Sequence, residues 1–79
     1  MIKVSKPLSE LKIGDQAKVV SVGGEKVFRR RLLDMGFTKG VNVQVIDVAP
    51  LGDPMKLSIR GYELSIRKKQ AEKILVSEG

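Results

Sequence analysis

Two different spacings of apolar residues meet in the middle of the chain, and they predict a helix followed by a strand. Phe28, Leu32 and Met35 recur every three to four residues, as one face of a helix requires. Valines at odd positions over 41–45 alternate with polar residues, as in a half-buried strand. The period therefore changes between Met35 and position 41.

Gly36 is the expected end of this helix. Helices commonly end on a left-handed residue, a conformation that glycine adopts without steric cost. Phe37 follows, placed to make with Leu32 the apolar contact that accompanies such a cap. We therefore predict a helix over residues 25–35, with Gly40 in the turn that leads into the next strand.

The strand predicted over residues 41–49 is irregular. Its apolar set changes from odd positions to Ile46 and Val48. Such a slip indicates a β-bulge near Val45 or Ile46. A bulge bends a strand, as a small barrel requires.

A hairpin is predicted over residues 55–67, where apolar and polar residues alternate on both sides of a glycine. We assign Gly61 and Tyr62 to a two-residue loop of type II′, which takes glycine first. This register pairs Arg60 with Glu63. The other predicted elements are a helical turn at 7–11, a first strand at 16–22, a helical turn at 68–73 and a last short strand at 74–76.

These elements predict a mainly β domain with short helices. The expected architecture is a small, bent antiparallel barrel, partly open, of about five strands, with a helix inserted after the first strand. A chain of 79 residues has room for one core, so residues 1–79 are expected to form a single domain.

The amino-acid composition excludes several kinds of site and catalysis. The chain has neither cysteine nor histidine, which excludes disulfides, zinc fingers and catalysis by thiolate or imidazole. It has no apolar run near the ~20 residues of a membrane-spanning helix, so we expect a cytoplasmic protein. Fifteen basic against nine acidic residues give a charge of +6, which suits an acidic partner or a solvated basic surface.

The run Arg29-Arg30-Arg31 is the first candidate binding site. Successive helix residues diverge by about 100°, so at most two of the three guanidinium groups can act together. We expect Arg31 to lie along the core edge while Arg29 and Arg30 reach water. Two interpretations of this run remain: contact with an acidic partner, and a solvated helix face without a partner.

The loop at residues 50–54 is the second candidate. Pro50 and Pro54 stiffen it, Gly52 permits an unusual backbone angle, and the carboxylate of Asp53 can bond nearby amides. A rigid turn between two strands is the plain alternative. Leu51 suggests more, because an apolar residue on a rigid exposed loop can anchor in a partner's pocket.

The sequence predicts neither a metal site nor a cofactor. Its carboxylates are scattered, without the spacing of a calcium loop or a paired-carboxylate site. An enzyme is not expected, because so short a chain can scarcely enclose a pocket. A small basic nucleic-acid-binding barrel is the alternative function, although Tyr62 is the only aromatic residue left for base stacking.

Three segments together resemble the FeoA family over nearly the whole chain: RRRLLDMGFTKG, VAPLGDP and RGYELSIRKKQAEKI. One departure is Lys39, where proline often precedes the second glycine. The resemblance implies an SH3-like barrel. It also implies an accessory factor that engages the cytosolic, GTP-binding side of the FeoB ferrous-iron transporter and supports or regulates iron uptake.

A related domain occurs in iron-dependent repressors, but this chain lacks their histidine and cysteine metal ligands, so we do not carry that role over. We therefore predict a non-catalytic, cytoplasmic interaction module, recruited to the inner face of the plasma membrane by a FeoB-like transporter, with no nucleic acid as partner. Its expected contacts are Arg29, Arg30 and Leu51 with the neighbouring Gly52 and Asp53. We expect loop and helix to form one docking surface.

Overall fold

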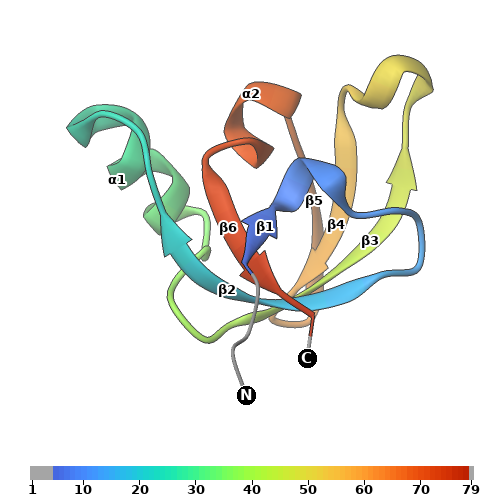
Figure 1. Ribbon diagram of the computed structural model, residues 1–79, viewed down its shortest axis with the longest axis horizontal. Coiled ribbons are helices and arrows are strands. Elements are labelled where there is room, and N and C mark those ends of the chain that lie inside the picture. Colours follow the sequence, from blue (N-terminus) through green and yellow to red (C-terminus); the bar gives the residue numbers. More distant parts are fainter. Residues whose placement is uncertain (1–4, 79) are drawn as a thin grey trace.

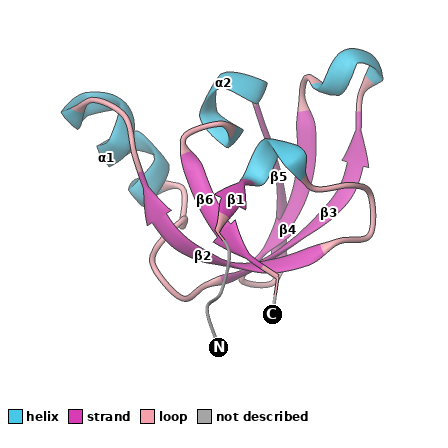
Figure 2. Ribbon diagram, in the orientation of Figure 1, coloured by secondary structure: helices cyan, strands magenta, loops and turns pink. Residues whose placement is uncertain are grey.

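A curved antiparallel sheet carries the whole fold, and two short helices and two 3-10 turns join its strands (Figures 1 and 2). The computed structural model describes residues 5–78. The strands are β1 (Lys6–Pro7), β2 (Gln16–Val22), β3 (Asn42–Val48), β4 (Met55–Ile59), β5 (Tyr62–Ile66) and β6 (Ile74–Ser77). The helices are α1 (Lys26–Asp34) and α2 (Lys68–Ala71), and the 3-10 turns are η1 (Leu8–Glu10) and η2 (Pro50–Gly52).

The strand order is β1-β6-β2-β3-β4-β5, which confirms the mainly β prediction. One detail differs from the expected barrel. The two-residue β1 precedes the strand predicted as the first, so the sheet has six strands and α1 follows the second of them. Within the described residues β1 and β5 remain edges, so the sheet curls without closing, in agreement with the partly open barrel that was predicted.

The core lies on the concave side of the sheet. Alternate residues of β4 (Met55, Leu57 and Ile59) are buried, as strand periodicity requires. Leu8 and Leu11, which lie within the helical turn predicted at residues 7–11, are buried as well. The bulge predicted in β3 is confirmed, because its register with β4 shifts between Val45 and Asp47.

The cap at the end of α1 is also confirmed. Gly36 has φ +110°, and its N–H donates to the carbonyl of Leu33 at 3.0 Å. The N–H of Phe37 donates to the carbonyl of Leu32 at 3.2 Å, which completes a Schellman motif. Both Phe37 and Leu32 are fully buried. The helix therefore stops where the sequence predicted.

The predicted hairpin register is wrong. Arg60 and Gly61 form the loop, with φ +51° and +86°, and Ile59 pairs with Tyr62. Positive φ at both central residues is typical of a type I′ turn, not type II′. The alternation could not decide this, because moving the pairing by two residues leaves every side chain on its own face. The observed register makes Tyr62 a strand residue, whose hydroxyl donates to the carbonyl of Met35 at 2.6 Å.

Candidate docking surfaces

The loop around η2 presents one apolar side chain to solvent. Leu51 is 95% exposed, the largest value among the exposed large hydrophobic residues within residues 5–78. Its backbone is left-handed, with φ +70°, and Gly52 after it is left-handed as well, with φ +78°. The sequence assigned the unusual angle to Gly52 alone. A branched side chain in this conformation costs about 1–2 kcal/mol, and exposed Leu51 recovers nothing by packing.

Asp53 ties this loop to the rest of the molecule. Its carboxylate accepts a hydrogen bond from the backbone N–H of Lys68, the first residue of α2, at 3.2 Å. Arg67 lies 3.8 Å from the same oxygen, and both side chains are well exposed, so this ion pair adds little. The sequence predicted that the carboxylate would bond an amide. It did not predict that the amide would belong to Lys68, 15 residues further along the chain.

Prolines frame the loop on both sides, as expected. Pro50 begins η2, and the carbonyl of Pro54 accepts a hydrogen bond from the N–H of Ala49 at 3.0 Å. The N–H of Gly52 donates to the carbonyl of Ala49 at 2.9 Å. The base of the loop is thus hydrogen-bonded, and Leu51 projects from a closed turn.

Helix α1 carries the second candidate site. Lys26, Arg29, Arg30, Leu33 and Asp34 line a surface pocket of about 290 Å³. The Nε–H of Arg29 donates to the carbonyl of Val22 at 3.0 Å, which fixes the plane of its guanidinium group.

Lys26 belongs to this pocket, and the sequence analysis missed it. Residues three and four apart lie on one helix face, so Lys26 shares a face with Arg29 and Arg30. Arg31 does not line the pocket. The helical spacing of the basic residues, instead of their adjacency, was the signal that would have found Lys26.

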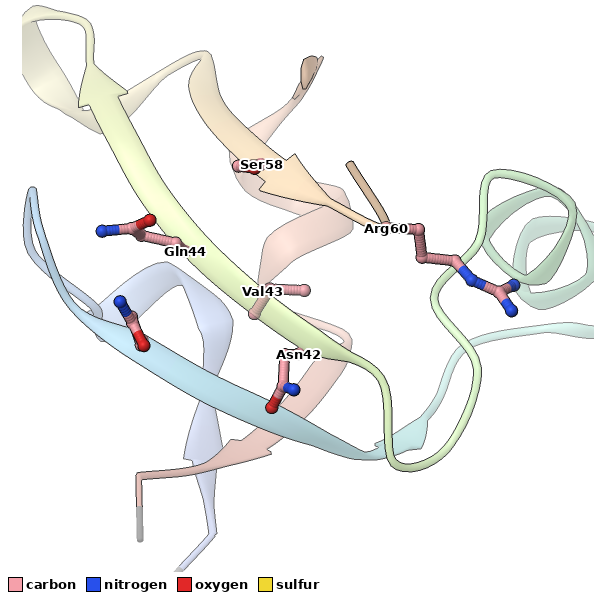
Figure 3. Close-up of a pocket in the computed structure, with 6 residues that line it drawn as sticks. Asn42, Val43, Gln44, Ser58 and Arg60 are labelled. Carbon is pink, nitrogen blue, oxygen red and sulfur yellow. The ribbon is translucent and has the colours of Figure 1, made fainter. Parts of the chain in front are cut away.

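Other hollows lie on the described surface, and two of them adjoin α1 and the sheet face. One of about 430 Å³ separates the start of α1 from α2, with Phe28 among its lining residues and Lys69, Lys73, Glu25 and Glu72 around it. The other, of about 240 Å³, lies on the outer face of the sheet (Figure 3). Its polar residues are Gln16, Asn42, Gln44, Ser58 and Arg60.

The structure does not bring the two predicted sites together. Figure 1 places α1 at one side of the molecule and the η2 loop at the opposite side, with α2 between them. The molecule is 32 Å along its longest axis. A partner that touches both the η2 loop and α1 must therefore reach from one side of the molecule to the other.

Across residues 5–78 no cluster of three or more acidic side chains is arranged to hold a metal ion. In the same part of the chain, no helix has the length and apolar character needed to cross a bilayer.

Comparison with known proteins gives one consistent answer. The FeoA domain model matches residues 6–78. A fusion of Fe(2+) transport protein A with the Fe(2+) transporter FeoB from Porphyromonas gingivalis is 49% identical over 69 residues. That match covers 87% of this chain but 8% of the fusion protein, so the chain spans a small part of this relative.

Solved structures agree. A FeoA-like protein from Clostridium acetobutylicum has a TM-score of 0.86 and 41% identity, covering 96% of this chain and 87% of that one. Zinc-complexed FeoA from Stenotrophomonas maltophilia, described as a prokaryotic SH3 domain protein, has a TM-score of 0.76 and 30% identity. Its alignment covers 89% of this chain and 87% of that one.

A manganese-dependent transcriptional repressor has a TM-score of 0.88 over all of this chain and 44% of its own, but at 14% identity it shows the fold alone. The family matched is one of transport-associated domains and not of enzymes. With a family model over residues 6–78, relatives well above 30% identity and an SH3-like architecture in agreement, this chain belongs to the FeoA family.

Proposed function

We propose that this protein is a non-catalytic accessory factor that docks on the cytosolic, GTPase-containing region of a FeoB-type transporter and supports or regulates Fe(II) uptake. The fused relative supports this partner, because one polypeptide there carries both parts. Two domains joined in this way meet at a high effective concentration, so even a small interface suffices. The site of action is the cytoplasm, at the inner face of the membrane that holds the transporter.

The observation that carries the proposal is the exposure of the Leu51 side chain together with its left-handed backbone. Its side chain is 95% exposed and its backbone is left-handed. Strained residues that gain nothing from folding cluster at ligand clamps and binding loops. Burying a leucine side chain is worth about 1.5–3 kcal/mol, which a partner pocket would supply. Leu51 is thus the expected anchor, with Gly52 and Asp53 shaping the loop that presents it.

Arg29 and Arg30 are assigned a second contact in this proposal. Helix α1, which carries them, lies on the other side of the molecule from the η2 loop, so only a partner that spans the domain can reach both sites (Figure 1). A standard interface buries about 800 Å² on each partner, which is compatible with such a span on a small domain. We therefore treat the loop as the anchor and α1 as an auxiliary contact.

The test is co-purification with the untagged transporter from membranes. Leu51→Asp is expected to abolish capture of the transporter, because a charge cannot enter an apolar pocket. Its melting temperature should stay near that of the wild type, since the side chain packs against nothing in the fold. Ile13→Asp is the matched control, because Ile13 is another exposed apolar residue, 61% accessible, and lies between η1 and β2, outside both proposed contacts.

Capture of the transporter should survive in Ile13→Asp and disappear in Leu51→Asp. Equal capture by the wild type and Leu51→Asp would exclude the loop as the anchor. Equal loss in both variants would point to general surface charge instead of a specific pocket.

A further inference from the structure

The exposed face of α1 gathers positive charge that the fold does not use. Among residues 5–78 the ion pairs are Lys6–Glu78, Lys56–Glu63 and Arg67–Asp53, and none of them involves α1. We propose that the α1 pocket, which Lys26, Arg29 and Arg30 line, binds the dianionic head of a phosphate monoester. This proposal does not depend on the transporter.

Geometry favours a specific site over diffuse attraction. The hydrogen bond from Arg29 Nε to the Val22 carbonyl uses one donor of the guanidinium and leaves its two terminal nitrogens free. A side chain already held in place loses less conformational entropy when it binds a ligand. Arginine presents its donors in a planar fork that matches phosphate oxygens. Arg29 is therefore the preorganised centre of the pocket.

The charge of the pocket selects the ligand. Three basic side chains and the carboxylate of Asp34 leave two net positive charges. A phosphate monoester carries about −1.5 to −2 at neutral pH, whereas one carboxylate carries only −1. A phosphate monoester therefore neutralises the pocket, and a single carboxylate does not.

Size limits what the ligand can be. Sites for whole small molecules measure about 300–1,000 Å³, and the α1 pocket, at about 290 Å³, lies at the lower edge of that range. It fits a phosphate group with a short apolar stem, which half-buried Leu33 can contact. The phosphate of a small soluble ester and the head of a phosphatidic acid share this chemistry.

The other hollows lack this combination. Beside Phe28, two lysines are balanced by two glutamates, so the charge there is neutral. On the sheet face, Arg60 is the only charged residue in the lining, among amide and hydroxyl side chains (Figure 3). Of these hollows, only the α1 pocket has two cations in excess of its carboxylates, the charge that a phosphate monoester balances.

The test is an NMR titration of the protein with inorganic phosphate at neutral pH and constant ionic strength. Saturable shifts are expected in α1 and at the Arg29 Nε–H, with Kd in roughly the millimolar range. Arg30→Gln and Lys26→Gln should each weaken binding about tenfold, the lower end of what one hydrogen bond to a charged group contributes. Lys12→Gln, the same charge change in the η1–β2 turn away from α1, should leave Kd unchanged.

Arg29→Lys separates charge from geometry. It keeps the positive charge but loses both the fork and the bond to Val22, so weaker phosphate binding supports the proposed site. Arg30→Gln protects this test against misfolding, because Arg30 is exposed and makes none of the ion pairs above. Shifts that spread over all basic residues without saturating would overturn the proposal. Acetate shifting α1 as strongly as phosphate would also overturn it.

A second arm identifies the source of the phosphate. Co-sedimentation is measured with phosphatidylcholine vesicles that do or do not contain phosphatidic acid. Binding that requires phosphatidic acid and is lost in Arg30→Gln supports the site and assigns it to a lipid head. Phosphate binding in solution without vesicle binding also supports the site and assigns it to a soluble ester. Failure in both arms would overturn this inference while leaving the Leu51 proposal untouched.

Discussion

The two sides of this domain solve the same structural problem in opposite ways. Each needs a left-handed residue where the chain turns. At the end of α1 that residue is Gly36, which adopts φ +110° at little steric cost. In the η2 loop it is Leu51, which adopts φ +70° with its side chain in water. The helix end that packs into the core uses the residue suited to the turn, and the loop that we assign as the anchor for the transporter does not.

The two sides also differ in how tightly they fit. A side chain at Gly36 would place its Cβ 2.9 Å from the Tyr62 hydroxyl oxygen, whereas Gly52 has nothing within 4 Å. The α1 side is held by the Tyr62–Met35 hydrogen bond, and the loop side by the Asp53–Lys68 bond. Stability therefore concentrates at the helix cap, while the loop tip is free to meet a partner.

The largest expected effect comes from adding a β-branched side chain at each turn. Gly36→Val should destabilise the fold by about 2–4 kcal/mol, the sum of a left-handed penalty and a clash with Tyr62. Gly52→Val should cost only the backbone penalty, about 1–2 kcal/mol, because its surroundings are open. Urea denaturation of both variants measures the difference. Equal costs would mean that the two turns are not packed differently.

A smaller effect of opposite sign is expected at Leu51. Leu51→Asn should stabilise the fold by about 0.5–1 kcal/mol, because asparagine tolerates the left-handed conformation and the exposed leucine loses no packing. The same variant should no longer capture the transporter. Thermal unfolding together with the membrane co-purification measures both properties.

Arg60 provides the control for that variant, since in the described part of the chain it is the other non-glycine residue with positive φ, at +51°. Arg60→Asn should also gain stability but retain the transporter. If the Leu51→Asn protein gains stability and still captures the transporter, the leucine side chain is not required for docking.

The smallest effect is expected where the loop is tied to α2. Asp53→Ala should cost about 0.5–1.5 kcal/mol through the lost hydrogen bond to the Lys68 N–H. Asp53→Asn keeps an oxygen acceptor and should cost less, since the exposed ion pair with Arg67 contributes little. Chemical denaturation of the two variants measures their free energies of unfolding and separates the hydrogen bond from the charge. Equal losses would assign the contribution to charge and not to the hydrogen bond.

Local patterns predicted most of the elements. The helix, its glycine cap and the bulge in β3 all follow from the spacing of apolar residues within short stretches of chain. The hairpin register did not follow, because the periodic pattern is unchanged when the pairing moves by two residues. Strand β1 was missed, because two residues are too short to show a period.

For the candidate sites too, some features follow from the sequence and others only from the tertiary structure. The sequence alone determined which residues could bind, namely Arg29, Arg30 and the loop with Leu51, because residue type and local stiffness are properties of neighbours in the chain. Only the tertiary structure decided that the two groups lie on opposite sides, and that the Asp53 carboxylate meets the Lys68 amide. Contacts between distant segments depend on how the sheet curls and pairs, and no short stretch of sequence records that.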